Sequence, residues 1–200
     1  MASQSSRLQE YSECRRIAGI GQIGRRHLAM NAFDGILTMI GVLMGSYIAG
    51  ISDPFIVLYT GLATSVAMGI SGFWGAYMTE SAERKHELAE LEQAMLRNLS
   101  QTKKARAGRF AVVAVSIIDG LSPLVAGFIV VSPFLLPVDL LSMHFSYYVS
   151  LGIAMAMLFA LGVFLAKVAR ENIVRSGVRM LFAGLACVGL SFLLGASRAH

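Results

Sequence analysis

The chain has 200 residues, of which 56% are hydrophobic and only 14% are charged, and its mean hydropathy is +0.64. This balance, with 20 glycines and 11 methionines, is typical of a polytopic membrane protein and excludes an ordinary soluble globule. The formal charge of +5 does not indicate nucleic-acid binding, because the basic residues lie between apolar segments, where they set membrane topology.

The first residues, 1–27, carry several arginines but lack the short apolar core of a signal peptide. We expect this segment to be a cytoplasmic tail that forms an amphipathic helix at the membrane surface. Cys14 lies in this tail and Cys187 lies in an apolar segment, which predicts neither a disulfide framework nor a cysteine-based metal site.

Five later segments reach the length of about 20 apolar residues that a helix needs to cross a bilayer. They cover residues 28–49, 54–78, 110–136, 145–166 and 178–196. The predicted fold is therefore all-α, a polytopic membrane protein with one transmembrane domain of five helices over residues 28–200.

Lysine and arginine concentrate in the N-terminal tail and in the connections after the second and fourth spans, whereas residues 50–53 and 137–144 contain neither. By the positive-inside rule, the N-terminus is cytoplasmic and the C-terminus lies on the opposite side. The second helix meets no breaker at its end, so we expect it to extend into a cytoplasmic segment at about residues 79–109. The basic stretch 100–108 suits anionic lipid headgroups.

The first span contains one carboxylate, Asp34. An acid inside a membrane span is costly and marks a functional site by default. At 100° per residue, Asp34, Gly41 and Gly45 fall within about 20° of one helix face, and Thr38 flanks it. The glycine pair lets another helix approach closely, so we expect Asp34 to face a helix contact. A packing face with a protonated or hydrogen-bonded Asp34 is the alternative.

The extension of the second helix carries four carboxylates spaced i, i+3, i+7 and i+10, within an arc of roughly 80°: Glu80, Glu83, Glu87 and Glu90. Like charges on one face are destabilising, and a divalent cation that prefers oxygen ligands would relieve them. The alternative is a solvated acidic face that Arg84 and Lys85 neutralise. His86, at the edge of the arc, fits a surface position better than a metal ligand.

The third span carries a second acid, Asp119, followed by Gly120 and Pro123. Two acids near the middle of one small bundle suggest a shared polar pathway. Because proline lacks an N–H, Pro123 also leaves a backbone carbonyl beside Asp119 as a further oxygen ligand. A kink stabilised by Asp119 and Ser122 is the alternative. The fourth and fifth spans contain no acid and are interpreted as scaffold.

Three features in this order resemble the vacuolar iron transporter family. They are Asp34-Gly35, then Ser71-x-x-x-Gly75-Ala76-Tyr77, then Glu83-Arg84-Lys85-His86 with Glu87 and Glu90. The resemblance implies a homodimer in which ferrous ions pass between the two copies near their first spans and leave the cytoplasm in exchange for protons. It also implies that Asp34 is the translocation carboxylate.

Two departures from the family pattern concern metal binding. The family carries methionine directly after the serine that matches Ser71, whereas this chain has Gly72; Met68, one turn earlier, is the candidate substitute. The better-known members also insert a cytoplasmic metal-binding domain of several helices, which is reduced here to the glutamate helix and a short connection. No family motif explains Asp119.

The predicted function is transport of a divalent metal, first of all Fe²⁺, with no permanent cofactor. The glutamates collect the ion, which then passes to Asp34 with help from Thr38, Met68 and Asp119. In a low dielectric a carboxyl group holds either a proton or a metal ion, which is the basis of antiport. Manganese or broad divalent-metal transport is one alternative. A membrane-embedded partner protein that docks through its acidic helix and transports nothing is another.

An enzyme is not expected. The sequence contains no HExxH motif, no Gly-x-Ser-x-Gly elbow and no phosphate-binding glycine loop. The partners expected for the predicted transporter are the metal ion, protons, the lipid bilayer and a second copy of the chain.

Overall fold

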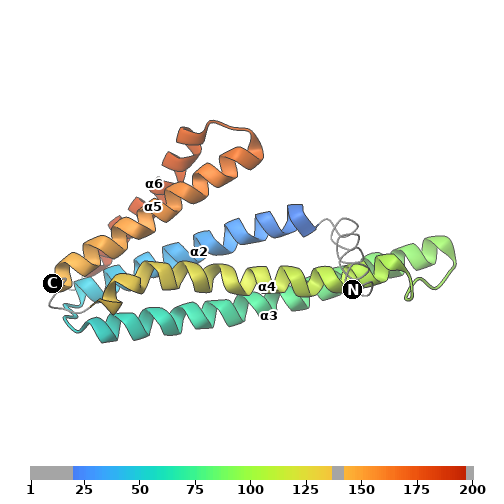
Figure 1. Ribbon diagram of the computed structural model, residues 1–200, viewed down its shortest axis with the longest axis horizontal. Coiled ribbons are helices and arrows are strands. Elements are labelled where there is room, and N and C mark those ends of the chain that lie inside the picture. The colour runs from blue at the N-terminus through green and yellow to red at the C-terminus, as the bar shows by residue number, and fades with distance from the viewer. Residues whose placement is uncertain (1–19, 137–141, 197–200) are drawn as a thin grey trace, which may run out of the picture. The chain divides into compact units, whose positions relative to one another are not determined.

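The computed structural model of the chain describes residues 20–136 and 142–196 (Figure 1). The described residues form helices and connections, without a β-strand. Within these ranges five long α-helices follow one another, with a short 3₁₀ helix, η1 (Ser132–Leu135), after the third. The α-helices are α2 (Ile20–Ile48), α3 (Pro54–Met95), α4 (Lys103–Val131), α5 (Met143–Ala169) and α6 (Ile173–Ala196).

All five helices are long and apolar enough to cross a membrane, with mean hydropathies between 1.5 and 2.4 in their most apolar windows. This confirms the predicted all-α fold with five membrane-spanning helices. The unbroken helix α3 also agrees with the prediction, because no residue between Pro54 and Met95 interrupts it. That its second half lies in the cytoplasm remains a prediction.

Four helices begin earlier than predicted, among them α5 at Met143 instead of residue 145 and α6 at Ile173 instead of residue 178. Helix α2 starts at Ile20 instead of residue 28, and α4 starts at Lys103 instead of residue 110. Arginine and lysine are good helix formers, so α2 and α4 already begin in the basic residues that precede their apolar segments. The basic stretch predicted as a connection is therefore mostly the first turns of α4. Residues 1–19 of the predicted amphipathic tail, with Cys14, lie outside the described residues.

The chain forms two compact units, which each combine parts of the first three helices. Unit 1 comprises residues 1–28 and 70–121, and unit 2 comprises residues 29–69 and 122–200. In unit 1, small residues line the buried side of α4, among them Ala107, Ala111 and Ser116, each fully buried. Small side chains at helix contacts allow the backbones of membrane helices to approach closely.

The core of unit 2 gathers the apolar face of α2 against residues from α3, α4, η1 and α5. Ile36, Met39, Ile40 and Leu43 supply that face of α2, and each is at most 1% exposed. Gly35 lies on the α4 side, where an added Cβ would be only 2.8 Å from the Cα of Pro123. The glycine of the Asp34-Gly35 pair is therefore a contact point for Pro123.

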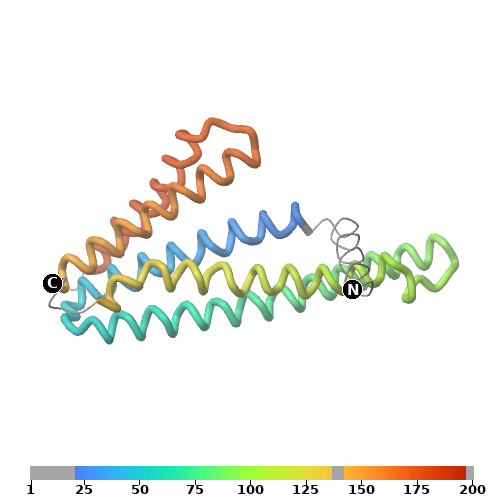
Figure 2. Tube along the Cα trace, in the orientation of Figure 1, coloured from blue at the N-terminus to red at the C-terminus, as the bar shows by residue number. Residues whose placement is uncertain are grey.

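Helices α5 and α6 form a tight antiparallel hairpin in unit 2, visible as the two adjacent orange and red coils of the tube (Figure 2). Arg170 ends α5 in the left-handed conformation, with φ of 57°. The side chain of Asn172 then accepts the N–H of Val174 at 3.0 Å and begins α6. At the closest approach, an added Cβ on Gly162 would lie 2.7 Å from the Cα of Gly177.

We expect Gly162→Leu to destabilise the hairpin by about 1–3 kcal/mol, because the new side chain would collide with the backbone of α6. Thermal unfolding of the detergent-solubilised protein, followed by circular dichroism, measures the change. Gly152→Leu is the control, since Gly152 is exposed on the same helix and has no atom within 4 Å of an added Cβ. Equal unfolding temperatures for both variants would contradict this packing.

Candidate functional site

Asp34 is exposed on α2, on the side of the helix that points away from the core of unit 2. At 100° per residue, the core residues Ile36, Met39 and Leu43 lie 140° to 200° from Asp34, on about the opposite face. The carboxylate thus projects from a helix whose other side is fully packed. No described side chain buries it.

Gly41 and Gly45 lie on the same face as Asp34, and an added Cβ at either would meet nothing within 4 Å. Gly45 is exposed, whereas Gly41 and the flanking Thr38 are half-buried. We call this surface, made by Asp34, Gly41 and Gly45, the Asp34 face. It is open in the single chain, so a helix from outside the described residues has room to approach it closely.

Met68, the predicted substitute for the family's methionine, is half-buried on α3 in unit 2. The side chain of Ser65, one turn earlier, is buried and donates to the Gly61 carbonyl at 2.8 Å. The same hydroxyl lies 3.7 Å from the sulfur of Met39. The role of Met68 in a metal path stays a prediction.

Asp119 is in unit 1, where it is only 6% exposed. Nδ1 of His27 in α2 lies 3.0 Å from each of the two carboxylate oxygens of Asp119, within hydrogen-bonding distance. Nε2 of the same ring lies 4.0 Å from a carboxylate oxygen of Glu80, which is 8% exposed. A histidine therefore connects two buried acids that come from different helices.

Arg84 continues this group along α3. Its guanidinium lies 3.6 Å from the carboxylate of Glu80 and 3.1 Å from that of Glu87, one turn before and one turn after it. We call His27, Glu80, Arg84 and Asp119 the His27 cluster. A buried charge is stable only when it is paired, and here a guanidinium and an imidazole provide that pairing.

The other two predicted glutamate ligands, Glu83 and Glu90, are exposed. The carboxylate of Glu90 lies 3.3 Å from the exposed His86. This glutamate therefore has a polar partner on its own helix. No three His, Cys, Asp or Glu side chains within residues 20–136 and 142–196 are arranged to hold a metal ion. The four-glutamate metal site stays a prediction that requires rearrangement of these ion pairs or ligands from another copy.

Gly72, the departure from the family pattern, has a steric reason in unit 1. An added Cβ at this position would lie 2.8 Å from the backbone carbonyl oxygen of Asp119. Helix α4 therefore passes so close to α3 that a methionine side chain does not fit here. The absence of a methionine at position 72 and the burial of Asp119 therefore both involve the same contact between α3 and α4.

His27 is the residue that the sequence analysis missed. It was assigned to the tail, because the predicted first span began at residue 28, whereas α2 begins at Ile20 and carries His27 on a continuous helix. The sequence did contain one indication of its role. A buried Asp119 needs a polar partner, and His27 is the histidine at the start of the first apolar segment.

The family model of the VIT family matches residues 26–113 and 93–196 of the chain. An uncharacterized protein, MJ0645 of Methanocaldococcus jannaschii, is 31% identical over 177 residues, which are 87% of this chain and 90% of that protein. These matches confirm the resemblance that the motifs around Asp34, Ser71 and Glu83 had indicated. The chain is a member of the VIT family.

Proposed function

We propose that this VIT-family protein exports divalent metal ions from the cytoplasm, first of all Fe²⁺, in exchange for protons. Membership of the family and five membrane-length helices indicate a membrane metal-ion transporter. The observation that carries the proposal further is the exposure of Asp34 on a glycine face opposite to the packed core.

An exposed carboxylate on a membrane helix is costly in contact with hydrocarbon. A second copy of the chain that covers the Asp34 face removes this cost, and the two glycines allow the two α2 helices to approach closely. A two-fold interface places the same residues of both copies opposite each other. The proposed homodimer therefore brings two Asp34 carboxylates to one path.

Two facing carboxylates provide oxygen ligands for a hard or borderline divalent cation. In the proposed exchange these carboxylates hold either the metal ion or a proton, which couples the two movements. Thr38 at the edge of this face, Met68 and Asp119 are the further proposed members of the path.

The glutamate helix is the proposed entry for the ion, on the cytoplasmic side that the distribution of lysine and arginine predicts for the N-terminus. Arg84 already occupies the space between Glu80 and Glu87, so an entering cation must displace its guanidinium. Oxygen ligands alone discriminate poorly between Fe²⁺ and Mn²⁺. Manganese is therefore the second candidate cargo, and competition between the two ions during uptake distinguishes them.

We expect Asp34→Asn to reduce Fe²⁺ uptake into proteoliposomes with an acidic lumen to the rate of protein-free liposomes. The amide neither carries the charge that holds the metal nor exchanges a proton. Asp53→Asn is the matched control, because Asp53 is exposed in a turn and only accepts the N–H of Phe55 at 2.8 Å, a role that asparagine retains. Undiminished uptake by the Asp34 variant would refute the proposed path.

We expect Arg84→Gln to lower the half-saturating Fe²⁺ concentration for uptake about two- to fivefold, the range expected for its solvent-accessible pair with Glu87. The substitution frees Glu80 and Glu87 for the cation. Lys85→Gln makes the same change in net charge without breaking either ion pair, and serves as the control. A rise in the half-saturating concentration for the Arg84 variant alone would show that Arg84 supports metal binding instead of competing with it.

We expect Gly72→Met, which introduces the family's methionine, to destabilise the protein by about 1–3 kcal/mol through collision with the Asp119 backbone. Thermal unfolding of the purified protein tests this against Gly75→Met, since an added Cβ at Gly75 meets nothing within 4 Å. A Gly72 variant as stable as its control would mean that α3 and α4 are less closely packed than the structure shows.

A further inference from the structure

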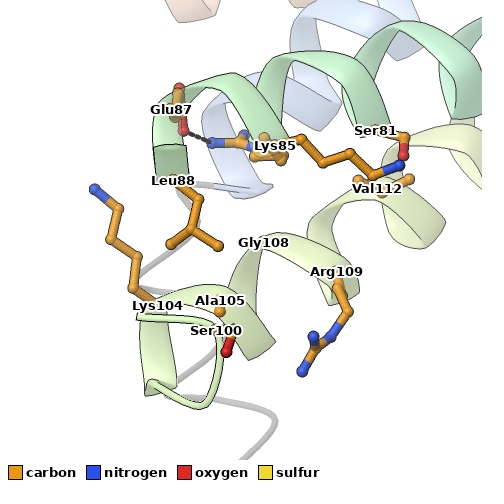
Figure 3. Close-up of a pocket in the computed structure, with 11 residues that line it drawn as sticks. Ser81, Lys85, Glu87, Leu88, Ser100, Lys104, Ala105, Gly108, Arg109 and Val112 are labelled. Carbon is orange, nitrogen blue, oxygen red and sulfur yellow. Dashed lines mark hydrogen bonds and ion pairs between the residues drawn. The ribbon is translucent and has the colours of Figure 1, made fainter. Parts of the chain in front are cut away.

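A cleft of about 210 Å³ lies between α3 and α4 in unit 1 (Figure 3). Figure 3 shows Leu88 of α3 pointing toward Ala105 and Gly108 of α4, with Lys104 and Arg109 on the two sides of this glycine. An added Cβ at Gly108 would make ordinary van der Waals contact with the side chain of Arg84, at 3.8 Å, and would not collide with it. The cleft therefore lies next to cationic side chains, and Gly108 tolerates a larger side chain.

The charge around this cleft is strongly positive. Four cationic side chains line it, against the single carboxylate of Glu87. That carboxylate is already paired with Arg84. The remaining three cations form no ion pair with any residue of the described ranges: Lys85, Lys104 and Arg109. Their uncompensated charge repels a metal cation and attracts an anion.

The cleft also has an apolar part. Val112 and Ala105 are 6% and 8% exposed, and they line it together with Leu88. On both helices the cleft falls where the charged segment meets the apolar one: just after the predicted span that ends at residue 78, and around residue 110, where the next one begins. An occupant with a negative charge and an apolar portion would match both parts of this cleft.

We propose that this cleft binds the phosphate headgroup of an anionic phospholipid. Arg109 and the two lysines lie around the cleft and turn toward the phosphate oxygens when the lipid binds, as guanidinium and ammonium groups do in other phosphate sites, and Ser81 and Ser100 line the same space. The acyl chains follow the apolar surface beyond Val112 into the bilayer. This site is separate from the Asp34 face and does not depend on the transport proposal.

Native mass spectrometry of the full chain in a neutral detergent tests the site, with dioctanoyl phosphatidylglycerol as the probe and dioctanoyl phosphatidylcholine as the neutral lipid. We expect one phosphatidylglycerol per chain to bind in preference to phosphatidylcholine. Lys104→Gln with Arg109→Gln should weaken this binding about 25-fold, since each cation near a charged headgroup contributes about a fivefold change. Arg97→Gln with Arg175→Gln removes two exposed cations outside the cleft and should leave the binding unchanged.

Gly108→Leu provides a second variant that keeps every charge and fills the cleft. It should also weaken phosphatidylglycerol binding, and it should not impair the helix, because leucine favours a helix more than glycine does. Equal loss in the control double variant, or full binding in the Gly108 variant, would overturn the site. Inorganic phosphate that competes as well as phosphatidylglycerol would overturn the lipid assignment in favour of a soluble anion.

Discussion

One constraint governs helix α2: a carboxylate within a membrane helix is costly unless polar groups cover it. Helix α2 uses its apolar side for the core of unit 2, where Met39 and Ile40 are completely buried. Asp34 is left on the other side, beside glycines that no described atom approaches. In the proposed homodimer, a second copy of the chain covers it.

Two buried acids of unit 1 have a different environment from that of Asp34. Asp119 and Glu80 are buried, and within the same chain His27 lies next to Asp119 and Arg84 next to Glu80. Such pairs connect three helices, and removal of one partner leaves a buried polar group unpaired at considerable cost. A cation that uses these carboxylates must therefore compete with resident partners, whereas a cation at Asp34 meets an acid that no described side chain buries. This difference makes Asp34 the better candidate for a site that loads and unloads.

Much of the fold was predictable from the sequence, because five apolar segments of membrane length leave few alternatives to five helices. The helix starts were not predictable from hydropathy, since Arg25 and Lys103 lie in helical turns that precede the apolar pattern. The same error concealed His27. The orientation of the Asp34 face followed from helical periodicity, but the reason for Gly72 required the position of the Asp119 backbone, which no pattern along the chain contains.

Anomalous diffraction from crystals soaked with Fe²⁺ or Mn²⁺ tests the central claim most directly, because it locates the ion and its ligands together. The account predicts a peak at the Asp34 carboxylates, between two copies of α2 related by a two-fold axis. A peak bound only by groups of a single chain, with the two Asp34 side chains far apart, would contradict it.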